Sequence, residues 1–179
     1  MSLWKFLSKC LFLAVVMSLL FGCPYDSEVP LGRSELAHID KGLVGNWLYR
    51  NNDQKESGIV TISPFSESEL LIVVREEGKS THDFYRAFVS IVEGEKFLNI
   101  QEIKPTNEKR SWMFVNYSVA NSELTIGIVE DKLFKDKIAS SIALNDFIQA
   151  NIKNRDLYGS DGGSVLKLVR EVPSKPDRK

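Results

Sequence analysis

Histidine, the side chain best suited to acid–base and metal chemistry near neutral pH, occurs only as His38 and His82. A zinc site with nitrogen and sulfur ligands needs several His or Cys residues close together, and two distant histidines do not supply them. A Ser-His-Asp triad would have to use His82, but the chain has no Gly-x-Ser-x-Gly nucleophile motif. We therefore interpret both histidines as surface residues, and we expect neither a metal nor a cofactor.

The carboxylates are also arranged without an obvious catalytic pattern. Glu93, Glu95, Asp131 and Asp136 lie in or beside predicted turns, where acidic residues are usually solvated. Glycoside hydrolysis needs two carboxylates at a defined separation in a cleft, which sequence spacing does not indicate. The segment Ser160-Asp161-Gly162-Gly163 is too short for an EF-hand calcium loop and predicts a turn. We expect a protein that is not an enzyme.

The chain has two cysteines, and the residues before Cys23 predict where the protein is located. Lys5 and Lys9 are followed by a largely apolar run at residues 11–21, and no acidic residue occurs in residues 1–22. A cationic start, a short apolar middle and a small residue before the cleavage point are typical of a secretory signal peptide.

The segment Leu20-Phe21-Gly22-Cys23 resembles the lipobox of bacterial prolipoproteins, with the small Gly22 beside the cysteine. The resemblance implies removal of residues 1–22 and attachment of fatty acyl chains, such as palmitate, to Cys23. An uncleaved signal anchor and ordinary cleavage without lipid remain alternatives. The apolar run of about 11 residues is shorter than the roughly 20 that a helix needs to cross a bilayer.

The resemblance also implies a place in the cell envelope, with the protein bound to the membrane through acyl chains on Cys23. In enteric-type bacteria an Asp after the lipid-bearing cysteine directs retention in the inner membrane, and Pro24 stands there instead. We therefore expect the outer membrane, facing the periplasm, rather than the inner membrane.

Composition limits the function of the mature chain. Removing residues 1–22 leaves 157 of the 179 residues, a normal size for one domain. The loss of Lys5 and Lys9 from 23 basic residues, against 24 acidic ones, brings the net charge near −3. This charge argues against a nucleic-acid partner, which favours a basic face. With Cys23 acylated no intrachain disulfide can form, so stability must come from a hydrophobic core.

The mature chain divides into three parts. Residues 23–40 contain Pro30, Gly32 and several charges, which predict a lipid-bearing cysteine followed by a flexible tether. Residues 41–171 contain the regular patterns of a folded domain. Residues 172–179 are charged and proline-rich and predict a disordered tail.

Short apolar segments separated by turn residues predict a mainly β domain. Tight turns between them favour antiparallel pairing of neighbours, and seven consecutive strands of this kind usually close into a barrel. The predicted strands are Val44–Arg50, Gly58–Ser63, Glu69–Glu76, His82–Val92, Lys96–Ile103, Ser111–Val119, Glu123–Glu130 and a returning Val165–Arg170.

One helix is predicted before the last strand. Apolar residues follow helical spacing between Ser141 and Ile152, and Ser140 or Ser141 is a suitable N-cap. The preceding segment Asp131–Ile138 is predicted as a short helix or an irregular link. Its apolar side chains either cap the barrel or form a patch for a partner.

The first predicted strand carries a motif that resembles the opening of lipocalins and the wider calycin group. Gly45 and Trp47 form a Gly-x-Trp pattern, and Arg170, near the end of the last strand, can pack over the indole as a late arginine does in lipocalins. The resemblance implies an antiparallel eight-stranded calycin-like, or lipocalin-like, barrel. The chain also resembles a group of uncharacterised bacterial lipoproteins with the same leading motif, late helix and final arginine.

Aromatic residues alternate along the predicted strands and are the remaining candidates for a site. They either fill a solid core or line a cavity for a small apolar ligand, which an eight-stranded barrel can enclose. In the second case Arg86 and Arg110 would be polar groups at its mouth. The candidate lining residues are Phe84, Phe88, Phe97, Trp112 and Phe114.

Two functions are compatible with these patterns. The first is a membrane-anchored, non-catalytic domain that binds a small or lipidic molecule. The second is a protein-interaction module, such as an envelope assembly factor or an inhibitor, with a packed barrel and no ligand. A continuous cavity favours the first, and a packed core with an exposed apolar patch favours the second.

Overall fold

The structure is a computed structural model that describes residues 23–51, 56–104, 110–158 and 165–171. The predicted signal peptide, the predicted tail at 172–179 and the predicted turn at Ser160-Asp161-Gly162-Gly163 lie outside the described residues.

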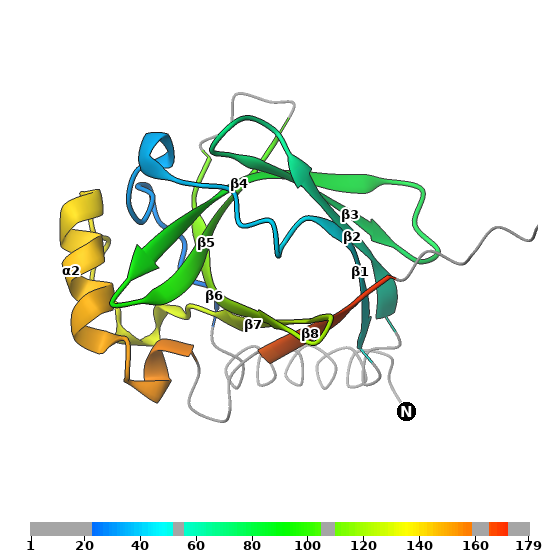
Figure 1. Ribbon diagram of the computed structural model, residues 1–179. Coiled ribbons are helices and arrows are strands. Elements are labelled where there is room, and N and C mark those ends of the chain that lie inside the picture. Colours follow the sequence, from blue (N-terminus) through cyan, green and yellow to red (C-terminus); the bar gives the residue numbers. More distant parts are fainter. Residues whose placement is uncertain (1–22, 52–55, 105–109, 159–164, 172–179) are drawn as a thin grey trace, which may run out of the picture.

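Eight antiparallel strands close into a barrel in which each strand pairs with its sequence neighbours and β8 pairs with β1 (Figure 1). Among the described residues one α-helix, α2 (Ser141–Asn151), precedes the last strand. The predicted fold class is therefore confirmed. The strands are β1 (Gly45–Asn51), β2 (Glu56–Pro64), β3 (Leu70–Glu76), β4 (His82–Val92), β5 (Glu95–Glu102), β6 (Met113–Ala120), β7 (Glu123–Ile128) and β8 (Val165–Arg170).

Two hairpin turns explain how neighbouring strands stay antiparallel at one end of the barrel. Glu93 and Gly94 join β4 to β5 with φ of 50° and 82°, and Asn121 and Ser122 join β6 to β7 with φ of 49° and 64°. Two successive positive φ values define a type I′ turn, whose twist matches that of the strands it connects.

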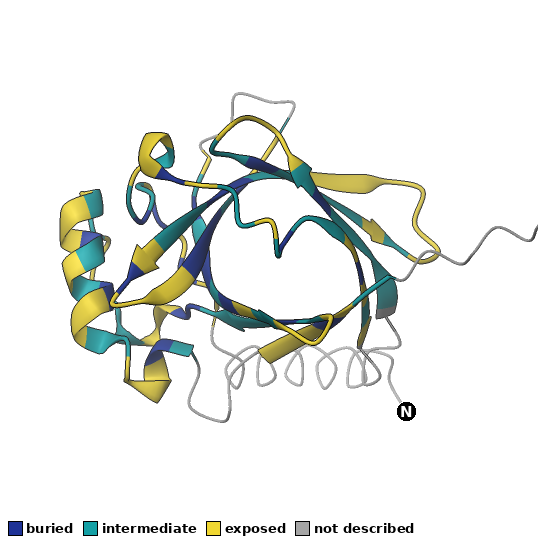
Figure 2. Cartoon of the chain, in the orientation of Figure 1, coloured by how far each residue is buried: buried dark blue, intermediate teal, exposed yellow. Residues whose placement is uncertain are grey.

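The outer wall of β4, β5 and β6 is covered by a second layer. The layer consists of α2, the segment at residues 23–37 and the short 3₁₀ helices η2 (Asp131–Leu133) and η3 (Arg155–Tyr158). Figure 1 shows α2 standing beside this wall, and Figure 2 shows its outer surface exposed. The Ser140 side chain accepts a hydrogen bond from the Ala143 N–H, which confirms one of the two predicted N-caps.

Residues 23–40 are not the flexible tether that their prolines, glycine and charges indicate. Pro24 and Ser27 form isolated β-bridges with Glu130 and Trp112. The side chains of Tyr25, Ser27 and Leu31 are buried. The prediction missed this packing because the apolar residues here have no regular spacing, and they fill gaps between other elements instead of forming one face of a helix or strand.

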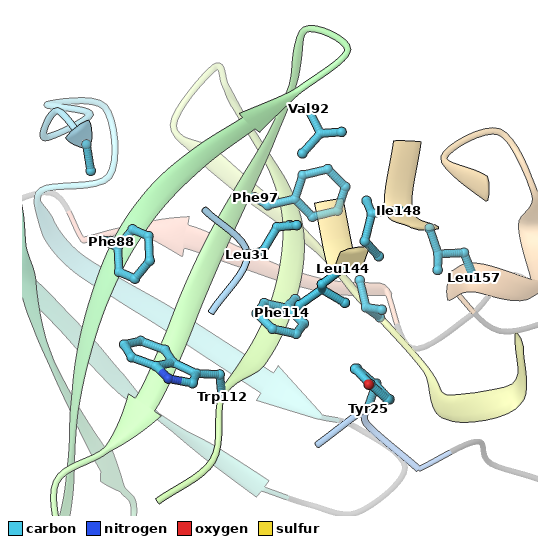
Figure 3. Packing of buried hydrophobic residues seen from close by; sticks show 12 residues of the cluster. Tyr25, Leu31, Phe88, Val92, Phe97, Trp112, Phe114, Leu144, Ile148 and Leu157 are labelled. Carbon is cyan, nitrogen blue, oxygen red and sulfur yellow. The ribbon is translucent and has the colours of Figure 1, made fainter. Parts of the chain in front are cut away.

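Leu31 is the centre of this attachment. Its side chain is fully buried among residues of the wall and of α2, including Phe97, Phe114 and Ile148 (Figure 3). Two polar side chains hold its backbone: its N–H donates to Oδ1 of the buried Asn99 over 2.7 Å, and its carbonyl accepts from Oγ of the half-buried Ser90. Asn99 in turn donates to Ser90 Oγ over 2.8 Å.

The predicted link at Asp131–Ile138 also belongs to this layer. The ring of Phe134 stacks on Tyr25 with a centroid separation of 3.5 Å, and the Ile138 N–H donates to the Tyr25 hydroxyl over 3.2 Å. Leu133, Phe134 and Ile138 are partly buried against the outer cluster. They neither cap the barrel nor form a free apolar patch.

Replacing Leu31 with alanine is expected to lower the free energy of unfolding by about 2–5 kcal/mol, because it leaves a cavity under a packed segment. Leu36, which is 73% exposed on the same segment, provides the matched control, and Leu36→Ala should change stability by less than about 0.5 kcal/mol. Urea unfolding of the purified proteins measures both. Equal stabilities for the two variants would indicate that residues 23–37 do not pack against the barrel wall.

Candidate functional site

The barrel interior contains an apolar cavity of about 180 Å³. Because side chains alternate along each strand, the inward-facing positions of β2 to β8 form its wall. Aliphatic residues predominate, and among the described lining residues the only polar side-chain atoms are the hydroxyls of two tyrosines. The lining residues are Leu43, Val60, Ile62, Ile72, Val74, Tyr85, Leu98, Ile100, Met113, Val115, Tyr117, Leu124, Ile126, Leu166 and Leu168.

None of the five aromatic residues predicted to line a cavity does so. Four of them pack on the outside of the barrel in the cluster covered by α2 and the N-terminal segment (Figure 3). Alternation identifies residues that share a face, but it does not say which face is the interior. The prediction that the aromatic residues face the interior was wrong, because the covering layer forms a second hydrophobic core against the outer face of the wall. The four residues are Phe88, Phe97, Trp112 and Phe114.

The fifth aromatic residue and the two candidate arginines also lie away from the cavity. Phe84 is 45% exposed on the outer face of β4. Arg86 lies over the Trp112 ring, 5.1 Å from its centroid, and donates to Gln101 over 2.9 Å. Arg110 is exposed and donates to the Lys104 carbonyl.

One end of the cavity is closed by the residues of the predicted Gly-x-Trp motif. Trp47 is fully buried, and its indole N–H donates to the Leu43 carbonyl over 2.7 Å. The Arg170 guanidinium lies 4.2 Å from the centre of the Trp47 ring, as the motif predicts, and donates to the carbonyls of Val44 and Gly42. A Cβ on Gly45 would lie 2.6 Å from Arg170 Nη1, and the φ of 141° also favours glycine there.

Asp40 fixes the segment that crosses this closed end (Figure 1). Its carboxylate accepts hydrogen bonds from Lys96 Nζ over 2.7 Å, the Gly42 N–H over 2.9 Å and the Tyr117 hydroxyl over 3.0 Å. Partial burial raises the pKa of Asp40, but the hydrogen bonds from Lys96, Gly42 and Tyr117 outweigh it and hold the pKa below its usual value. Burial and the Asp40 charge raise the pKa of Tyr117, so its hydroxyl stays protonated and donates.

The opposite end of the cavity is open. Along β8 the inward-facing Leu168 is 1% exposed, whereas Leu166, nearer the other end, is 37% exposed. Along β4 the inward-facing residues change from the buried Ala87 through the half-buried Tyr85 to the exposed Asp83. In both strands the exposure of the inward-facing residues increases toward the same end of the barrel. The mouth of the cavity therefore lies at the end where β3 connects to β4.

A second hollow of about 730 Å³ lies along β1, β2, β3 and β8. It is broad, and both signs of charge line it, from Arg50, Arg75 and Lys167 to Glu76 and Glu77. The interior cavity is the better candidate site, because an enclosed apolar space can desolvate a ligand and an open charged groove does so poorly.

The described residues offer no other site of recognisable chemistry. His38 and His82 are exposed, and no three His, Cys, Asp or Glu side chains in this part of the chain are grouped to hold a metal. Among the helices of the described residues, none has the length and hydropathy needed to cross a membrane.

Comparisons with known proteins found no matching protein-family model, no matching curated protein and no matching solved structure.

Replacing Asp40 with asparagine is expected to lower the free energy of unfolding by about 1 kcal/mol at pH 7, because the bond to Lys96 loses its charge. The folded pKa of Asp40 lies below the unfolded value, so its contribution is complete above about pH 4 and is lost as pH falls through the folded pKa. The difference between the wild type and Asp40→Asn should therefore shrink below pH 4. Thermal unfolding between pH 2.5 and 7 measures it.

The matched control is Asp146→Asn on the exposed face of α2, which should show no such pH-dependent difference. A difference between wild type and Asp40→Asn that stays constant down to pH 2.5 would contradict the assigned role of the carboxylate.

Proposed function

We propose that this protein is a lipid-anchored domain of the bacterial cell envelope that binds a small apolar molecule inside its barrel. The observation that carries the ligand-binding part is the apolar cavity of about 180 Å³, closed at one end and open at the other. The lipobox resemblance at Cys23 carries the anchoring part, and Pro24 after the cysteine favours the outer membrane facing the periplasm.

The size and lining of the cavity support a ligand that is both small and apolar. An engineered cavity of about 150 Å³ lined by aliphatic and aromatic side chains stays free of water and binds benzene. The cavity here is slightly larger, and the described part of its wall offers water two hydroxyls, one of which is bonded to Asp40. An apolar molecule entering it gains roughly 25 cal/mol for each Å² removed from water.

The position of Cys23 supports its use as an attachment point. Its side chain is exposed and free, while its carbonyl accepts a hydrogen bond from the Asp131 N–H over 3.0 Å. The sulfur is thus accessible to modification without disturbance of the packed residues that follow it. Acyl chains there would hold the protein at a membrane, at about 0.8 kcal/mol for each buried methylene.

The alternative is a protein-interaction module that uses the outside of the barrel. Leu48 of β1 lies between Ile59 of β2 and Val169 of β8 in the strand register, and Leu48 and Val169 are 41% and 55% exposed. Ile59 is half-buried, so the row presents two exposed apolar residues and one half-buried residue across three strands, which makes it a candidate contact surface. A partner bound there would not depend on the cavity, and this separates the two functions experimentally.

Replacing Cys23 with alanine is expected to abolish acyl attachment and to release the protein from the membrane fraction, or to leave it unprocessed. Cys10→Ala is the matched control and should retain both the acyl chains and the membrane association, because residue 10 lies before the cleavage point. Mass spectrometry of the mature N-terminus and radiolabelled palmitate measure the modification. A mature wild-type protein with an unmodified Cys23 would contradict the proposal.

Replacing Val74 with phenylalanine is expected to fill much of the cavity and to abolish stabilisation by small apolar ligands. Val73→Phe is the matched control, since Val73 is adjacent on β3 but faces outward opposite Phe84. Thermal shifts with added toluene measure binding, and native mass spectrometry detects any ligand that copurifies. Ligand binding that survives Val74→Phe would place the site outside the cavity and favour the outer surface.

A further inference from the structure

The two hydroxyl groups that line the cavity are in different situations. The Tyr117 hydroxyl, at the closed end, is bonded to Asp40. The Tyr85 hydroxyl, toward the open end, has no hydrogen-bond partner among the described residues, and the Tyr85 side chain is half-buried. A hydroxyl beside an apolar space gains a hydrogen bond when a ligand supplies a partner, so Tyr85 is placed to select ligands by their polar group.

The charges around Tyr85 are predominantly negative. Tyr85 pairs with Glu102 in the strand register, so the two side chains share the inner face, and Asp83 follows on the same face of β4. Glu76 lies at the same end of β3. Burial raises the pKa of Tyr85, and the charges of Asp83, Glu102 and Glu76 raise it further. The hydroxyl therefore stays neutral, so it can donate to an acceptor such as an alcohol oxygen and accept from a donor such as an ammonium group.

Lysines offset part of this negative charge. Lys79 pairs with Glu76, and Lys104 pairs with Glu102 over 3.3 Å. Arg110 lies beside Lys104, since it donates to the Lys104 carbonyl. Among the described residues, the charges that act on the Tyr85 hydroxyl are nevertheless the three carboxylates of Asp83, Glu102 and Glu76. A ligand that brings a carboxylate or phosphate to Tyr85 therefore meets repulsion, whereas a neutral or cationic group does not.

We propose that the ligand is a compact apolar molecule with one neutral or cationic hydrogen-bonding group, such as an alcohol or an amine, which it presents to the Tyr85 hydroxyl at the mouth of the cavity. This inference rests on the proposed ligand-binding function of the barrel. Tyr85 would then distinguish ligands by the polar group that they present. Simple anions such as carboxylic acids in their ionised form are disfavoured.

A set of probes with one common body tests the inference. Toluene, benzyl alcohol, benzylamine and benzoate share a single ring, which matches the size of the cavity, and differ in the attached group. Their dissociation constants are measured at pH 7 for the wild type, for Tyr85→Phe and for the control Tyr158→Phe, whose ring packs outside the barrel. Tyr85→Phe removes one oxygen and leaves the ring in place, so the fold is retained.

The wild type is expected to bind benzyl alcohol or benzylamine about fivefold more tightly than toluene, and benzoate most weakly. Tyr85→Phe should abolish the preference over toluene while toluene itself still binds, and Tyr158→Phe should preserve the preference. Equal binding of toluene and benzyl alcohol, tightest binding of benzoate, or a preference that survives Tyr85→Phe would overturn the inference and leave the cavity function standing. Failure of all four probes to bind the wild type would overturn both.

Discussion

The seam between the first and last strands is the constraint on which the rest of the structure depends. β1 pairs with β2 through seven residues but with β8 through only three, from Trp47 opposite Arg170 to Tyr49 opposite Leu168. Arg170 adds to this short seam by lying on Trp47 and by donating to two carbonyls of the chain that leads into β1. Because barrel closure removes the exposed edges of β1 and β8, the interior space exists only while this seam holds.

The barrel wall separates two hydrophobic cores with different packing. The outer core, between the wall and α2, is filled by large rings and by Leu31, whose backbone a buried Asn99 and Ser90 hold in place. The inner core is lined mostly by aliphatic side chains and is incompletely filled. The phenylalanine rings of the two cores all lie in the outer one, whereas the aromatic residues of the inner core are Trp47 and three tyrosines, and a cavity remains among them.

Sequence patterns predicted the strands well and the site poorly, for one physical reason. Alternation and turn residues are local, so the eight strands, the cap at Ser140 and the Trp47–Arg170 contact could be anticipated. The inner or outer assignment of a face depends on what covers it, and the cover comes from distant residues such as Tyr25, Leu31 and Leu157. The residues that do line the cavity, such as Val74 and Tyr85, alternate on the same strands with residues that face outward. No local sequence signal distinguished the inward-facing residues from the outward-facing ones.

The hydrogen bonds that fix the chain at Cys23 and Tyr25 limit how a group on the Cys23 sulfur can move relative to the barrel. The Cys23 carbonyl and the Tyr25 N–H are both hydrogen-bonded to the chain that follows β7, so the first described residue is already fastened to the body of the protein. A group attached to the Cys23 sulfur would be separated from the folded domain only by the few bonds of the cysteine side chain. In the proposed attachment through Cys23, the direction in which the mouth points relative to the membrane would therefore be set by the fold and not averaged over a flexible linker.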